Sequence, residues 1–133
     1  MMLCYIVGDL FYMVNFFGSD ITEVLSTLKG NPDEFIEPLS LLSLLENFHV
    51  SLFLAILVIF TTMAIILRLN LSSLHKKFII ISAMVSLLLS FMSLIGTYFF
   101  NDIFVYAFVV FSISWHITSF YALVLILKQV MFK

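Results

Sequence analysis

FIIISAMVSLLLSFMSLIGTYFFN, residues 78–101, contains no Asp, Glu, Lys or Arg. Two further runs share this property, residues 47–67 and residues 103–127. As helices that rise about 1.5 Å per residue, all three runs can cross a hydrocarbon layer of about 30 Å. Because 63% of the residues are hydrophobic and 11% are charged, a soluble domain would have too little polar surface. The sequence therefore predicts one all-α integral membrane domain over residues 1–133, a polytopic transmembrane helical bundle.

The charged residues are sorted between the two ends of these runs. The basic residues at one end are Arg68, Lys76, Lys77, Lys128 and Lys133, and the acidic residues at the other are Asp20, Glu23, Asp33, Glu34, Glu37, Glu46 and Asp102. Only Lys29 stands against this positive-inside pattern. We expect the C-terminus on the cytoplasmic side of a bacterial inner membrane, or on the matching side of an organellar inner membrane. A net charge of −2 without a basic tract excludes nucleic acid as a partner.

Residues 1–17 are apolar but short, with Asp9 near their centre. They lack the Lys or Arg that begins a secretory signal peptide, so we expect a retained helix. Its polar residues share one helical face, which we expect to turn toward other helices: Tyr5, Gly8, Asp9, Tyr12 and Asn15. If this helix spans, the bundle has four crossings; if it lies in the interface, there are three. The expected helices are about 1–17, 47–68, 78–100 and 103–128.

An extracytoplasmic segment of about residues 18–46 follows the first helix. Asp20 and Glu23 have the spacing of a capping box, which predicts a short helix after residue 20. Gly30 is placed to end that helix. The sequence thus predicts a short amphipathic helical segment at the outer surface.

A second short helix is expected after this turn. Pro32 suits a first helical turn. The apolar residues 39–45 should then lie along the outer surface, with the chain bending into the membrane near Glu46. This acidic segment is either a plain surface linker or a docking surface for a partner.

Small and hydroxyl side chains recur along one stripe of the helix at 78–100. Steps of three or four residues place these members on one helical face: Ser82, Ser86, Ser90, Ser93, Gly96 and Thr97. In lipid such faces let helices approach closely, and their hydroxyl bonds contribute about 0.6 to 2 kcal/mol each. We expect a packing stripe, either inside this chain or against another subunit; a water-lined or ion-lined path is the alternative.

His116 lies near the middle of residues 103–127, on a face shared with Ser112 and Ser119. An imidazole at that depth must face protein, water or a cofactor. If the first helix spans, Asp9 lies at a similar depth, where a carboxylate costs about 2.5 to 3.5 kcal/mol on insertion scales. We therefore predict a hydrogen-bonded Asp9–His116 pair inside the bundle.

Two cofactors are compatible with a histidine at this depth. A b-type haem could take His116 as an axial ligand, with an unrelated residue or another chain's histidine opposite. A quinone could bind near His116, Trp115 and Tyr121. His49 is expected about 10 Å from His116 in depth, which is poor geometry for two ligands of one haem. No metal site is predicted, since Cys4 is the only cysteine and no H-E-x-x-H spacing occurs.

The stretch Arg68–Ser82, RLNLSSLHKKFIIIS, precedes the serine-bearing helix, and Tyr106–His116 lies in a later one. In these features residues 50–127 resemble the small multi-helix membrane proteins associated with assembly of haem-copper oxidases. The resemblance implies that His75, in the basic loop before one helix, and His116, within a later helix, carry the function.

No catalytic constellation occurs, because the sequence has neither paired carboxylates on one helix face nor a Ser-His-Asp arrangement with an oxyanion site. We therefore expect no enzyme acting alone. The favoured expectation is a non-catalytic accessory or assembly subunit of a larger membrane complex, with a respiratory complex as first choice. Its partners would be the lipid bilayer and other membrane protein subunits. The alternatives are a haem- or quinone-binding electron- or proton-transfer subunit using His116 with Asp9, and an immunity-type protein against a pore-forming toxin.

Overall fold

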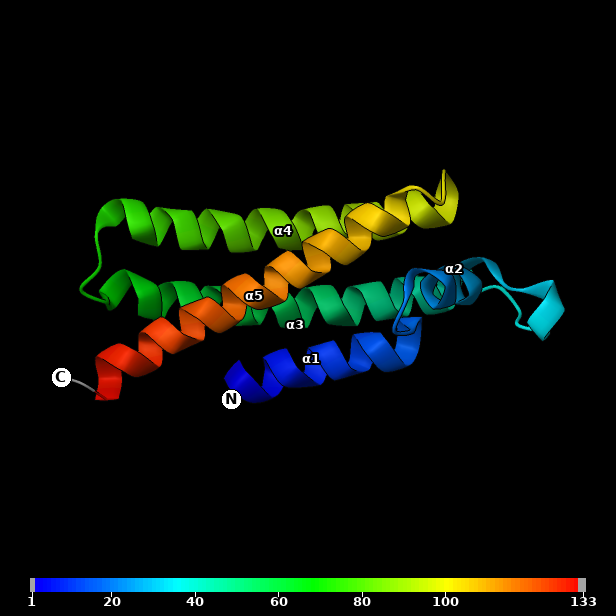
Figure 1. Ribbon diagram of the computed structural model, residues 1–133. Helices are drawn as coiled ribbons and strands as arrows, with labels where there is room; N and C mark the ends of the chain where they lie inside the picture. The colour runs from blue at the N-terminus through cyan, green and yellow to red at the C-terminus, as the bar shows by residue number, and fades with distance from the viewer. Residues whose placement is uncertain (1, 132–133) are drawn as a thin grey trace.

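The computed structural model describes residues 2–131, and its regular elements are all helical (Figure 1). The α-helices are α1 (Met2–Phe17), α2 (Ile21–Lys29), α3 (Leu41–Arg68), α4 (Ser73–Phe99) and α5 (Phe104–Met131), with a 3-10 turn η1 (Pro32–Glu34). In the described part of the chain, α3, α4 and α5 are long and apolar enough to cross a membrane, and α1 is a shorter apolar helix. The predicted all-α transmembrane bundle is confirmed.

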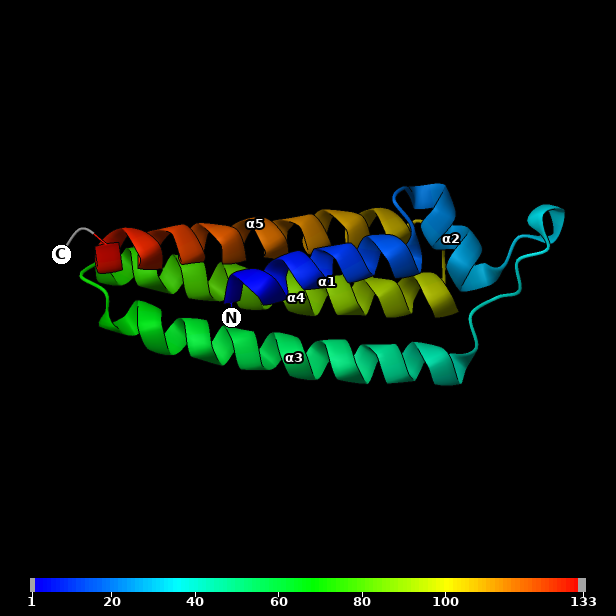
Figure 2. The same cartoon turned by 90° about the horizontal axis from the view of Figure 1, so that it is seen from below.

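The three long helices run alongside one another, as Figures 1 and 2 show. The α3–α4 connection and the end of α5 lie at one end of the bundle, which carries Arg68, Lys76 and Lys128. α2 and the α4–α5 turn lie at the opposite end, with most of the acidic residues. α4 packs along α5, while α3 contacts both and α1 lies on α5. We call these the basic end and the acidic end.

The predicted stripe on α4 lies against α5 of the same chain. Ser82 is half-buried and the other members are buried: Ser86, Ser90, Ser93, Gly96 and Thr97. Ser90 Oγ lies 2.8 Å from Ser112 Oγ of α5. A Cβ at Gly96 would lie 2.9 Å from the Phe104 ring, so only glycine allows this approach. Packing inside the chain is therefore the arrangement observed, and the stripe offers no surface to another subunit.

α2 is the short amphipathic helix expected at the outer surface. The Asp20 carboxylate accepts a hydrogen bond from the Glu23 amide at 2.9 Å. The Glu23 carboxylate accepts from the amide and hydroxyl of Ser19 instead of from Asp20, so the capping box is formed on one side only. Gly30 ends the helix with a φ of 80°. Val24 is buried, so α2 covers the acidic end of the bundle with its apolar face.

The second surface helix is not formed as predicted. Only η1 follows α2, capped by the Asn31 side chain, and an isolated bridge joins Asn31 to Ile36. Phe35 adopts a left-handed conformation with a φ of 54°. Its side chain is 95% exposed, and the segment projects beyond the end of α3 (Figures 1 and 2). The chain here is a loop because Asn31 and Phe35 close a tight turn before a helix can propagate.

α3 also differs from its prediction at its outer end. It begins at Leu41 and runs through Glu46 without the expected bend. Ser40 caps it by accepting a hydrogen bond from the Ser43 amide. Leu44 is buried in the cluster at the acidic end, so these apolar residues continue the helix instead of lying on the surface.

The polar face of α1 is only partly turned inward. Tyr5 and Asp9 are half-buried, and Tyr12 donates a hydrogen bond to Asn47 of α3. The two other members are exposed: Gly8 and Asn15. The predicted inward turn of the polar face therefore holds for only part of that face, because Ile6, Phe17 and other apolar residues also contact the bundle. α1 begins part-way along the bundle, and the choice between four crossings and three stays a prediction (Figure 2).

Candidate functional site

The structure brings Asp9 of α1 and His116 of α5 together. Nε2 of His116 lies 3.3 Å from Oδ2 of Asp9. The imidazole is 9% exposed and the carboxylate 15%, so α1 and α5 shield most of both groups. The sequence predicted a hydrogen-bonded pair of these two residues from their similar depth. The structure places the two groups in contact, and the hydrogen bond between them stays a prediction.

The contact made by the other imidazole nitrogen, Nδ1, decides which nitrogen of His116 carries the hydrogen. Nδ1 of His116 lies 2.7 Å from the carbonyl oxygen of Ser112, which can only accept, so Nδ1 carries the hydrogen. A neutral imidazole then leaves Nε2 as an acceptor facing a carboxylate. Nε2 indeed lacks an aligned hydrogen-bond partner, although it lies within ion-pair distance of Asp9. The contact becomes attractive only when the two groups share one additional proton.

A short hydroxyl network surrounds this pair. Ser112 Oγ lies 2.8 Å from Ser90 Oγ of α4, and it is 3.9 Å from the Met13 sulfur of α1. Ser112 therefore contacts α4 and α1 through its hydroxyl and His116 through its carbonyl oxygen. The pair is held by three helices, which limits how far the imidazole can turn.

A groove with both polar and apolar side chains along it runs between α1 and α3 and reaches Asp9. Its volume is about 600 Å³. Its lining comes from both helices: Cys4, Tyr5, Gly8, Asp9, Tyr12, Glu46, Asn47, Val50, Ser51 and Leu54. A smaller inner cavity of about 30 Å³ reaches from Asp9 to Ser90 and Ser112, enough for about two waters.

The residues proposed for cofactors are dispersed. Nε2 of His116, the nitrogen free to ligate a haem iron, faces Asp9. His75 lies at the basic end, where its Nε2 is 3.0 Å from the Tyr121 hydroxyl, and His49 is exposed on α3. The described histidines therefore do not fit a haem held within this chain.

The three residues predicted to lie near a quinone do not line one common groove. Trp115 packs against Ala55, Ile59 and Leu87 and does not line the groove that His116 and Tyr121 share. In residues 2–131, no group of three or more His, Cys, Asp or Glu could hold a metal ion. The described site thus contains one acid–base pair, Asp9 and His116, whose nearest side-chain atoms lie 3.3 Å apart.

Residues 6–133 match a family model described as a transmembrane helical domain, Aq_1264_TM. The chain belongs to this family. Since the family domain includes α1 from residue 6 onward, both Asp9 and His116 lie within it. The match and the three apolar helices establish an integral membrane protein in contact with the lipid bilayer. No curated protein and no solved structure matches the chain.

Sequence reasoning missed the part of the site that this transmembrane domain builds on α3. Asn47 and Ser51 line the groove opposite Asp9, and Asn47 accepts the hydrogen bond from Tyr12. A signal was present, because the two polar residues lie one helical turn apart and so share one face of a mainly apolar helix. Which helix they would face is not encoded in that spacing.

Proposed function

We propose that this chain is an integral membrane subunit that binds and transfers a proton at Asp9 and His116. The observation that carries the proposal is the 3.3 Å approach of His116 Nε2 to the Asp9 carboxylate inside the bundle. The subunit would work within a larger membrane complex rather than as an enzyme by itself. A respiratory complex is the partner class proposed, since such complexes couple chemistry to proton movement.

Energetics favours a protonatable pair over a purely structural one. A carboxylate inside a membrane bundle costs several kcal/mol unless it is paired, and two apolar side chains would fill the same volume without that cost. The pair alternates between two states by gaining or losing one proton, with Ser112 keeping the imidazole oriented in both. Ionisable groups at this depth typically mark proton relays or ion paths.

Infrared difference spectroscopy tests the proposal on the purified chain in lipid nanodiscs. Across a pH titration, the wild-type protein should show one carboxyl or imidazolium signal that Asp9→Asn lacks, beside the signals that the other carboxyls and histidines give in both proteins. Ser114→Ala is the matched control, because the Ser114 hydroxyl bonds only to Val110 of its own helix and lies off the site. A wild-type titration identical to that of Asp9→Asn would overturn the proposal.

A second function, assembly with another membrane protein, is favoured by the outer loop. Phe35 is 95% exposed in a left-handed conformation, and Asp33, Glu34 and Glu37 lie beside it in the sequence. An exposed aromatic held in a strained turn is typical of a contact residue. Its partner would present an apolar socket with a basic rim. In this arrangement the acidic end faces away from the cytoplasm, as the charge pattern predicts.

Tagged purification from native membranes in mild detergent tests this second function. Stoichiometric recovery of other membrane subunits by mass spectrometry is the expected result, and Phe35→Ser should reduce it at least about tenfold if the aromatic anchors the contact. Leu74→Ser, which changes an exposed residue at the basic end, is the control. Recovery of the chain alone would reject this function.

A further inference from the structure

We infer that the α1–α3 groove is a water-filled path that connects the Asp9–His116 pair to the acidic end. The inference rests on the proposed proton-binding role of the pair and adds the side of the membrane from which the proton arrives. The ligand of the groove is water, with the proton that it conducts.

The antiparallel course of α1 and α3 arranges polar groups in steps along the groove. Tyr12 bonds to Asn47, and Glu46 lies next to this bridge, near the acidic end. One helical turn deeper, about 5 Å, Asp9 lies opposite Ser51. A single water making two hydrogen bonds spans about 5 to 6 Å, so the steps match a chain of waters.

Unsatisfied polar groups show that the groove is a polar compartment. The Tyr5 hydroxyl is buried without a partner in the described structure. It lines the groove and the inner cavity together with Asp9. Water is the occupant that satisfies both groups, because a lipid chain would leave them unpaired at a cost of several kcal/mol each in hydrocarbon.

The opposite side of the pair has fewer such groups. Toward the basic end, His116 shares a groove with one other polar residue, Tyr121, whose hydroxyl lies 3.0 Å from Nε2 of His75. The rest of this groove is apolar: Ile6, Val7, Leu10, Ile117, Phe120 and Val124. Waters need two to four polar partners to be held, so this groove does not support a continuous chain. We therefore expect water to reach the pair through the α1–α3 groove.

The titratable groups facing the pair come mainly from the groove itself. α1 contributes Cys4, Tyr5 and Tyr12, and α3 contributes Glu46. α4 and α5 face the pair with the hydroxyls of Ser90 and Ser112. Two further titratable groups line the other grooves that His116 borders: Asp20 before α2 and Tyr121 of α5. Glu46 gives the entrance a negative charge, which raises the local concentration of cations, protons included. The Tyr12–Asn47 bridge crosses the groove between this entrance and Asp9.

Cysteine accessibility tests the path on the full chain in lipid vesicles. Gly8→Cys is introduced in a Cys4→Ser background, because Cys4 lines the same groove. A Cβ at Gly8 meets no atom within 4 Å, so the variant should fold. Phe11→Cys is the matched control, since Phe11 is 71% exposed on α1 but does not line the groove. A membrane-impermeant thiol reagent is added from each side.

Two reference cysteines mark the two sides of the membrane. With them the result can be interpreted whichever way the protein is oriented in the vesicles. Phe35→Cys marks the acidic end and Met131→Cys the basic end, since both side chains are highly exposed. Gly8→Cys should react from the Phe35 side at least about tenfold faster than Phe11→Cys. Tyr12→Phe should speed this reaction about fivefold, the equivalent of one lost hydrogen bond at the bridge.

Two results would overturn the inference: reaction of Gly8→Cys no faster than Phe11→Cys, or reaction from the Met131 side. Ser51→Cys, a near-isosteric change on the facing wall, repeats the measurement if Gly8→Cys does not fold. Thiol labelling does not require a proton at the pair, and the infrared titration does not require the groove. Failure of the path and failure of the proposed function are therefore distinguishable.

Discussion

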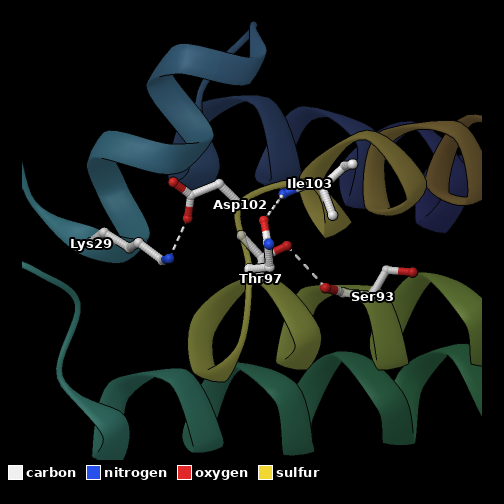
Figure 3. A network of polar contacts seen from close by, with 6 residues as sticks. Lys29, Ser93, Thr97, Asp102 and Ile103 are labelled. Carbon is white, nitrogen blue, oxygen red and sulfur yellow. Dashed lines mark hydrogen bonds and ion pairs between the residues drawn. The ribbon is translucent and has the colours of Figure 1, made fainter.

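Lys29 at the end of α2 forms an ion pair with Asp102 in the turn between α4 and α5 (Figure 3). The contact joins the outer helix to the tightly packed α4–α5 hairpin. It also accounts for the one basic residue that stands against the charge pattern. Lys29 lies at the acidic end with its charge compensated, so it does not oppose the orientation that the other basic residues favour.

Lys29→Ala should lower the free energy of unfolding by less than about 1 kcal/mol, because surface ion pairs are screened by solvent. The two side chains are 38% and 59% exposed, which places the pair in that class. Denaturation in detergent measures the change, with Lys77→Ala at the exposed basic end as control. The C-terminus should keep its side of the membrane in a reporter fusion. A loss above about 2 kcal/mol, or an inverted C-terminus, would contradict this account.

Gly96→Ala should destabilise the chain by about 1 to 3 kcal/mol, the usual cost of overpacking. The new Cβ would lie 2.9 Å from Cγ of Phe104 and 3.3 Å from its Cβ, atoms near the backbone that cannot swing away. Gly8→Ala is the matched control, because its Cβ meets open space. It should be neutral or stabilising by up to about 1 kcal/mol through helix propensity. Equal effects of the two substitutions would show that the α4–α5 contact is looser than described.

α2 should lose its cap as the pH falls. Hydrogen bonds from the Thr22 hydroxyl and the Glu23 amide hold the pKa of Asp20 below its ordinary value. A lowered folded-state pKa stabilises the helix above the unfolded value, near 4, and this stabilisation is lost as the pH falls through the folded value. The protection of the Glu23 and Val24 amides against hydrogen exchange, relative to the intrinsic exchange rate at each pH, should therefore fall below about pH 4.

Asp20→Asn is the control for this pH dependence, because asparagine caps a helix without titrating in this range. In this variant, the protection of the α2 amides should not fall as the pH passes the range in which Asp20 titrates in the wild type. Wild-type protection that stays constant down to pH 2 would contradict a role for the ionised Asp20 cap.

Replacing Asp9 and His116 by leucine, one at a time and together, should show that the effects of the two substitutions on stability are strongly coupled. His116→Leu leaves Asp9 without its partner and should cost about 3 to 5 kcal/mol. The double variant Asp9→Leu/His116→Leu should recover stability to within about 1 kcal/mol of wild type, since it removes both groups together. A double-mutant cycle by denaturation in detergent measures this. Additive losses would mean that the two side chains do not interact.

The helical pattern of α4 shows how far sequence reasoning reaches. A three- and four-residue recurrence of Ser, Gly and Thr predicts one small-residue face, and the structure has that face buried. The choice of partner could not be predicted, because a small-residue face accommodates any neighbouring helix. Contacts such as Gly96 with Phe104 depend on the short turn that returns α5 onto α4.

The outer segment shows where local patterns fail. Asp20 and Gly30 bound α2 as predicted, since caps are short-range interactions. The start of α3 at Leu41 was not predicted, because an apolar run next to a membrane can lie on the surface or continue a helix. Leu44 favours the helix only because Phe17 and Leu94 are there to bury it.

The sequence by itself determined the membrane class of this protein, its long helices and the separation of charge between its ends. These follow from composition and from interactions within a few residues, which act wherever the chain lies. Tertiary structure alone decided that α1 lies on α5, that Asp9 meets His116 at 3.3 Å, and that a polar groove lies against α3. Lateral placement of helices depends on side-chain packing summed over whole faces, and residue spacing along one helix carries no information about which neighbour that face will meet.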